Sequence, residues 1–127
     1  MRVPRFLIDT DVCIYLLTDS LPALSAKVAV QPAGSLSISA VSLAELSVRY
    51  GERAFAAPEL ASLLAEMPIL DFDEAAAKTY GALPFRRGSF DRLIAAHALS
   101  RDLILVTNNR RDFADVPRLK IENWTGP

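Results

Sequence analysis

The sequence has only one cysteine and one histidine among its 127 residues. Because a single cysteine has no partner for an internal disulfide, the chain is not one of the small domains that disulfides hold together. Cys13 lies in the apolar stretch Val12-Cys13-Ile14, which predicts a buried thiol in a reducing compartment. The histidine, His97, follows an apolar helical pattern, and Cys13 has no evident basic partner. The sequence therefore argues against Ser-His-Asp and Cys-His catalysis.

The chain also lacks an excess of either charge and a long hydrophobic run. Fourteen Lys and Arg residues against fifteen Asp and Glu residues give a formal net charge of -1, so no global positive field attracts it to nucleic acid. The longest charge-free stretch, 28–44, is interrupted by Gln31, Pro32, Gly34 and four serines, which excludes a membrane span of about 20 residues. The apolar run at 6–8 is too short for a signal peptide. We therefore expect a cytoplasmic protein that does not associate with membranes.

The apolar content predicts one folded domain over residues 1–127. Apolar residues make up 51% of the chain and charged residues 23%, which is typical of a globular domain. Short apolar runs predict strands, and periodic runs predict helices. Strands are expected at 6–8, 36–39, 69–70, 103–106 and 119–122, and helices at 12–17, 24–30, from 42 onward, 59–67, 74–83 and 90–100. This alternation predicts an α/β fold with a mostly parallel central β-sheet flanked by helices.

Acidic residues follow the predicted strands at comparable points. Asp9 ends the first strand, Glu45 lies in the first turn of the helix after the second, Asp91 opens a later helix, and Asn109 and Asp112 follow the last central strand. In a parallel sheet these positions lie along one edge, where ligands bind. Clustered carboxylates raise one another's pKa unless a cation lies among them, and a hard ion such as Mg²⁺ or Mn²⁺ prefers oxygen ligands. The pattern therefore predicts a metal site.

Each acid also has a structural alternative. Ser42-Leu43-Ala44-Glu45 fits the capping box, in which Glu45 bonds back to the Ser42 amide. Asp91 suits the first turn of a helix because of the macrodipole, and Asp9 suits a cap at the end of a strand. Independent caps need not all fall on the same edge of one sheet, so the joint pattern favours the metal site.

Four arginines flank two of these acids, Asp91 and Asp112. They form either a solvated rim or a set of cations that holds a phosphodiester beside the metal, and we favour the second interpretation. The four are Arg86, Arg87, Arg110 and Arg111.

The first acidic motif also allows a different enzyme. Asp9-Thr10-Asp11-Val12 approximates the D-x-D-x-[TV] start of haloacid dehalogenase-type phosphatases. That motif expects Thr or Val at the position of Cys13, and the chain lacks a well-placed lysine and a downstream Asp-Asp pair. The phosphatase is therefore the weaker alternative.

Five segments together resemble the successive motifs of PIN-domain proteins, and most of all the VapC-type toxins of bacterial toxin–antitoxin pairs. The resemblance covers nearly the whole chain in the right order. It implies a PIN-like three-layer sandwich and a metal-dependent ribonuclease. The segments are Phe6-Leu7-Ile8-Asp9-Thr10-Asp11, Ser39-Ala40-Val41-Ser42-Leu43-Ala44-Glu45-Leu46, Asp91-Arg92-Leu93-Ile94-Ala95-Ala96-His97-Ala98, Leu105-Val106-Thr107-Asn108-Asn109-Arg110-Arg111-Asp112-Phe113 and Ile121-Glu122-Asn123-Trp124.

The resemblance implies roles for individual residues. Asp9, Glu45 and Asp91 correspond to the acidic triad, with Asp9 and Asp91 as the usual metal-binding pair. The chain departs from the family pattern at Asp11, where Asn is usual, and at Asn109, where many members have Asp. The second departure leaves Asp112 as the candidate fourth acid.

The resemblance also implies a mechanism. One or two Mg²⁺ ions, or Mn²⁺, are expected to activate a water for in-line attack on phosphorus. Several polar side chains are expected around the carboxylates, where they hold them in position. These supporting residues are Thr10, Asp11, Ser42, Thr107, Asn108 and Asn109.

The expected partners are an RNA substrate and a cognate antitoxin, within a complex in which the chain forms a homodimer. The C-terminal segment of such an antitoxin needs an apolar groove, which Tyr15, Leu16, Leu46, Tyr50 and Phe55 are candidates to form. Alternatively, these side chains fill the core. A non-enzymatic alternative is a PIN-fold binding module that is catalytically silent.

Overall fold

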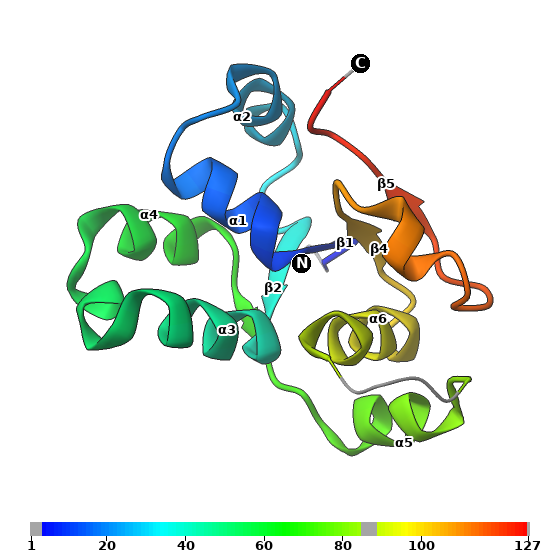
Figure 1. The fold of residues 1–127 in the computed structure, drawn as a ribbon. Helices are drawn as coiled ribbons and strands as arrows, with labels where there is room; N and C mark the ends of the chain where they lie inside the picture. The colour runs from blue at the N-terminus through cyan, green and yellow to red at the C-terminus, as the bar shows by residue number, and fades with distance from the viewer. Residues whose placement is uncertain (1–3, 85–88, 127) are drawn as a thin grey trace.

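The computed structural model describes residues 4–84 and 89–126. A five-stranded parallel sheet in the order β3-β2-β1-β4-β5 forms its centre (Figure 1). In chain order the elements are β1 (Phe6–Ile8), α1 (Thr10–Leu17), α2 (Pro22–Ala29), β2 (Leu36–Ser39), α3 (Ala40–Tyr50), the 3₁₀ helix η1 (Gly51–Ala56), α4 (Pro58–Glu66), β3 (Ile69–Leu70), α5 (Glu74–Ala82), α6 (Phe90–Ser100), β4 (Ile104–Val106), the 3₁₀ helix η2 (Arg110–Phe113) and β5 (Ile121–Glu122).

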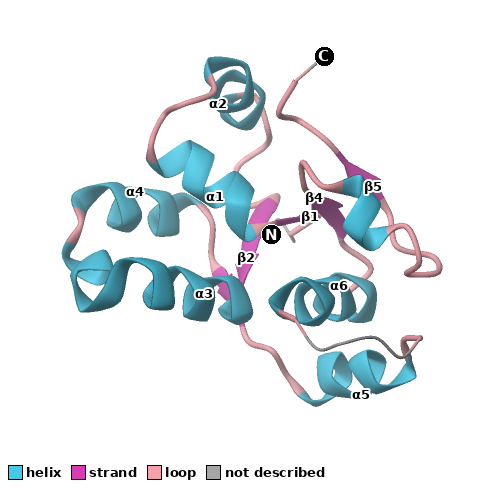
Figure 2. Cartoon of the chain, viewed as in Figure 1, coloured by secondary structure: helices cyan, strands magenta, loops and turns pink. Residues whose placement is uncertain are grey.

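The sheet has a hydrophobic core on each face. Phe6 and Ile8 of β1 pack with α1, α2 and α4 on one face, whereas Leu7 packs with α6 on the other. α5 packs along α6 on the second side (Figure 2). Because β1 is covered on both sides, its sequence is a continuous apolar run and does not alternate. The expected α/β sandwich with a parallel central sheet is confirmed.

The strand order reverses direction at β1. The chain runs outward from β1 to β2 and β3, and then returns to place β4 on the opposite side of β1. β1 pairs with β4 through Leu7 and Leu105 and through Ile8 and Val106. A crevice forms outside the carboxyl ends of two strands at such a reversal, and open α/β sheets bind ligands there.

α1 and α3 begin earlier than the sequence predicts, whereas α6 begins at the predicted residue. The N-cap of α1 is Asp9, whose side chain accepts from the Thr10 amide. α3 begins at Ala40 with Ser39 as its N-cap, so the capping box at Ser42 is wrong and Glu45 lies in the second turn. α6 begins at Phe90, with Ser89 as its N-cap.

Among the described residues no single helix is long and apolar enough to cross a bilayer. α1 and α2 reach the length and the apolar content of a membrane span only when they are taken together, and the two helices are bent by 101° relative to each other.

Candidate functional site

Asp9 lies at the carboxyl end of β1 and is only 3% exposed. Its Oδ1 accepts a hydrogen bond from the Thr10 amide, and its Oδ2 accepts one from the Thr107 hydroxyl, both at 2.8 Å. Thr107 follows β4, and its oxygen accepts in turn from the Asn109 amide at 3.1 Å. Hydrogen bonds from two neighbouring strand ends therefore fix both oxygens of this carboxylate.

The pKa of Asp9 is raised from 3.8 to about 7. Burial is the largest cause, and the negative charges of Asp91 and Asp11 add to it, whereas the hydrogen bonds from Thr107 and Thr10 act in the opposite direction. A buried carboxylate prefers the neutral form because water no longer solvates its charge. Asp9 therefore lies in a place that favours either a proton or a metal cation.

Asp91 and Glu45 meet where α6 packs against α3. Burial and then the charges of Glu45, Asp112 and Asp11 raise the pKa of Asp91. One oxygen of Glu45 is buried and has no hydrogen-bond partner among the described residues. The described charges that act on Asp91 are all negative, so the acids of α1, α3, α6 and η2 form one electrostatic cluster.

The segment after β4 places Asn109 beside Asp112. The Asn109 side-chain amide donates to Asp112 Oδ2 at 2.6 Å, so the two residues form one unit on the exposed 3₁₀ helix η2. Asn108 turns elsewhere, and its side-chain amide donates to the Tyr15 hydroxyl at 3.0 Å. Neither contact was visible as a sequence pattern.

The remaining candidate residues have less defined contacts. The hydroxyls of Thr10 and Ser42 are buried and have no hydrogen-bond partner within residues 4–84 and 89–126. Asp11 is exposed in the first turn of α1. Arg110 and Arg111 are exposed on η2. The other two arginines, Arg86 and Arg87, lie outside the described residues.

His97 is buried away from these acids. Its Nδ1 lies 2.7 Å from the Ser39 hydroxyl, and the edge of its ring contacts Phe72. Burial, with a smaller contribution from Arg101, lowers its pKa and favours the neutral ring. The histidine thus packs between β2 and α6, and Cys13 is likewise fully buried.

The charge and the hydrogen bonding of the acids are compatible with a hard divalent cation. In the described part of the chain, ion pairs join Lys78 to Glu74, Arg92 to Asp115 and Lys120 to Asp102, so no described Lys or Arg forms an ion pair with the acids of the cluster. In that same part, no three acidic, histidine or cysteine side chains lie close enough to enclose a metal by themselves. Mg²⁺ is commonly bound by one or two carboxylates and several waters, which this arrangement allows.

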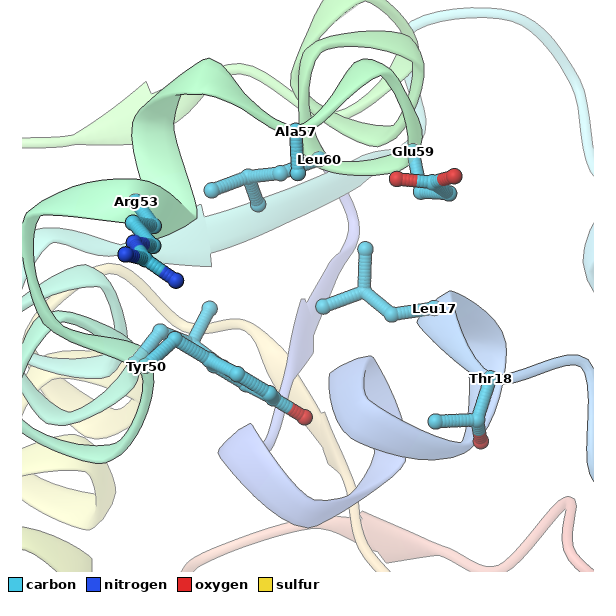
Figure 3. Close-up of a pocket in the computed structure, with 8 residues that line it drawn as sticks. Leu17, Thr18, Tyr50, Arg53, Ala57, Glu59 and Leu60 are labelled. Carbon is cyan, nitrogen blue, oxygen red and sulfur yellow. The ribbon is translucent and has the colours of Figure 1, made fainter.

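A separate apolar hollow of about 320 Å³ opens between α1, α3 and α4. In Figure 3, Tyr50 and Leu17 lie on opposite sides of it, with Leu60 above them. Arg53 and Glu59 lie at its two upper ends. A second hollow of about 340 Å³ lies between α1, α2 and α4.

The expected groove residues divide between these hollows. Leu46 and Tyr50 line the first and Leu16 lines the second, while Tyr15 bonds to Asn108. The side chain of Phe55 lies outside the described part.

Comparison with known families identifies the fold. The PIN domain family matches residues 6–119. The chain belongs to the PIN domain family. This membership excludes the haloacid dehalogenase alternative. In this PIN domain the family match includes every acid of the cluster, from Asp9 to Asp112.

Relatives of the PIN domain are similar along almost the whole chain. This chain is 33% identical to a protein of Shigella flexneri named tRNA(fMet)-specific endonuclease VapC. The alignment covers 95% of this chain and 98% of that protein. The structure of DNA-bound VapBC from Salmonella typhimurium matches with a TM-score of 0.82 at 28% identity, covering 96% of this chain and 99% of that one. VapBC2 from Rickettsia felis, bound to a promoter DNA fragment, matches with a TM-score of 0.81 at 27% identity and covers 94% and 98%.

Proposed function

We propose that this PIN domain is a metal-dependent endoribonuclease and the toxin of a type II toxin–antitoxin pair. The observation that carries the proposal is the buried Asp9, whose pKa is raised to about 7 and which is coupled to Asp91 at the crevice of the sheet. The similarity to proteins named as VapC endonucleases supports RNA as the substrate. The single PIN domain acts in the cytoplasm.

Asp9 and Asp91 hold the metal, Mg²⁺ or Mn²⁺. Each oxygen of Asp9 accepts one hydrogen bond, and a carboxylate has about four lone-pair sites, so lone pairs remain for a cation. When bound, a divalent ion polarises the phosphodiester and lowers the pKa of water. Burial and then the charges of neighbouring acids raise the pKa of Asp91, so its carboxylate would be stabilised by a bound cation.

The other residues position the reactants. Glu45 lines the hollow beside Asp91 and orients the attacking water through a hydrogen bond to its carboxylate. Asp112 completes the site, held by Asn109, and Thr107 fixes Asp9. Thr10, Asp11, Ser42 and Asn108 support this arrangement from α1, α3 and the loop after β4. Arg86, Arg87, Arg110 and Arg111 bind the phosphates of the RNA.

The apolar hollow of Figure 3 receives the cognate antitoxin. An amphipathic segment laid into an apolar groove is a common mode of recognition, and Tyr50 is 40% exposed at its wall. The structural relatives named as VapBC complexes support an antitoxin as the partner. Within the complex the chain forms a homodimer.

The test is cleavage of single-stranded RNA by the purified full chain. We expect cleavage with Mg²⁺ or Mn²⁺, none with EDTA, and recovery when metal is restored. Asp91→Asn should abolish cleavage, whereas the matched variant Asp102→Asn should not, because Asp102 is an exposed carboxylate paired with Lys120. Activity that is indifferent to EDTA would refute the metal mechanism. A chain that does not bind metal and does not cleave RNA would instead be the catalytically silent binding module.

A further inference from the structure

A hollow of about 490 Å³ lies beside the proposed metal site. It is lined by Glu45 of α3 and by Ser89, Phe90, Asp91 and Leu93 at the start of α6. In Figure 1 the N-terminal end of α6 lies next to α3. Among the described residues, the lining of this hollow therefore combines two carboxylates and one serine with an aromatic and an aliphatic side chain.

Phe90 has no evident structural reason to be aromatic. It is 41% exposed, and the buried residues of α6 are others, from Arg92 to Ala98. The Ser89 hydroxyl caps the helix by accepting from the Arg92 amide, and the first helical position favours proline over an aromatic residue. Within the described part of the chain, neither the core nor helix initiation accounts for Phe90.

The hollow's chemistry suits the neutral part of a nucleotide. The carboxylates of Glu45 and Asp91 repel a phosphate unless a metal lies between them. They therefore contribute no affinity for the other phosphates of an RNA chain. Unpaired bases are uncharged and stack on aromatic side chains, as single-strand RNA-binding proteins show. One ribose separates a base from its own phosphate. Because Phe90 and Asp91 line the same hollow, a phosphate held at Asp91 brings a flanking base within reach of Phe90.

We propose that Phe90 is a stacking platform for one unpaired nucleobase that flanks the phosphodiester cleaved at Asp91, with Leu93 as the wall of the same subsite. The proposal rests on the proposed nuclease function and adds to it a contact with the base. It requires the nucleotide at the cleaved bond to be unpaired, so the enzyme selects single-stranded loops and not duplexes.

The experiment uses a labelled single-stranded oligoribonucleotide that the wild-type chain cleaves at one mapped bond. Phe90→Ala should raise KM by about 5-fold to 150-fold, the range expected for loss of one stacked base, with a smaller effect on kcat. Phe90→Tyr and Phe90→Trp should retain the wild-type KM. The matched control is Val48→Ala, which removes an exposed apolar side chain of α3. This variant should retain the wild-type KM and kcat.

An abasic nucleotide separates stacking from other roles. An oligoribonucleotide with the abasic nucleotide next to the cleaved bond, on the side where the base stacks, should have a higher KM with the wild type. With Phe90→Ala, the abasic nucleotide should cause no further increase in KM. Equal abasic effects in both proteins, or a wild-type KM in Phe90→Ala, would overturn the platform. A change of oligomeric state in Phe90→Ala, measured by light scattering, would instead assign Phe90 to a contact between copies. A wild-type chain that cleaves no RNA would overturn the nuclease itself.

Discussion

The buried carboxylate of Asp9 should make the free energy of unfolding depend on pH in an unusual direction. In the unfolded chain Asp9 has the ordinary pKa of 3.8, and in the folded chain about 7. Between these values the folded state keeps a proton that the unfolded state has lost. Stability falls with rising pH wherever the folded state binds more protons. The metal-free protein should therefore lose stability as pH rises from about 4 to 7.

The size of this loss follows from the difference in pKa. Each pKa unit corresponds to about 1.36 kcal/mol, so the ionised Asp9 costs on the order of 4 kcal/mol above pH 7. Asp9→Asn removes the charge and keeps the side-chain oxygen that accepts from Thr10, and Asn caps helices about as well as Asp. The bond with Thr107 must reverse direction, at a cost of about 1 kcal/mol.

The assay is urea unfolding in EDTA at several pH values. At pH 8 we expect Asp9→Asn to be more stable than the wild type by roughly 2–4 kcal/mol, whereas at pH 4.5 it should hold no advantage. Addition of Mg²⁺ at pH 8 should stabilise the wild type much more than the variant, because Asp9→Asn removes one of the two carboxylates that hold the ion. Glu74→Gln, which removes an exposed carboxylate paired with Lys78, is the control. An identical pH profile for wild type and Asp9→Asn would refute the reasoning.

Two further predictions concern the edge of the site and the groove. Asp112→Asn should lower the cleavage rate more than Asn109→Ala, because Asn109 acts by holding the Asp112 carboxylate; the reverse order in a cleavage assay would make Asn109 the more important residue. Expression of the chain alone should arrest growth, and co-expression of its antitoxin should rescue it. Tyr50→Glu should weaken that rescue without lowering nuclease activity, because it puts a charge at the wall of the apolar hollow; unchanged rescue would exclude this hollow as the binding site.

The fold was predictable from the sequence where one signal dominates. The apolar run at residues 6–8 has the bounds of β1, and α6 has the predicted range Phe90–Ser100. α5 begins at Glu74, the predicted residue, with Asp73 as its N-cap. In these segments apolar periodicity and cap chemistry indicate the same boundary.

The predicted start of α3 was wrong because two serines compete for the N-cap position. Ser39 continues the alternation of β2 and Ser42 fits the S-x-x-E pattern, so local chemistry favours the later cap. The structure selects Ser39, whose hydroxyl accepts from the Val41 amide. The 3₁₀ helices η1 and η2 were not predicted because both are too short to show a helical period.

The candidate acids followed from topology, but their contacts did not. A parallel sheet brings the strand ends to one edge whatever the side chains are, which is why Asp9, Glu45 and Asp91 were predicted as candidates. The bond from Asn108 to Tyr15 joins residues 93 positions apart. Such a contact depends on side-chain rotamers in the folded chain, and no periodicity in the sequence indicates it.

The bond between Thr107 and Asp9 spans 98 residues of a 127-residue chain, and this separation affects when activity first arises. β4 enters the sheet beside β1 only after β2 and β3 have been made. A growing polypeptide on the ribosome thus lacks Asp91, Thr107 and Asp112 for most of its synthesis. The order of the sheet therefore lets the acidic cluster assemble only after the chain has been synthesised as far as Asp112.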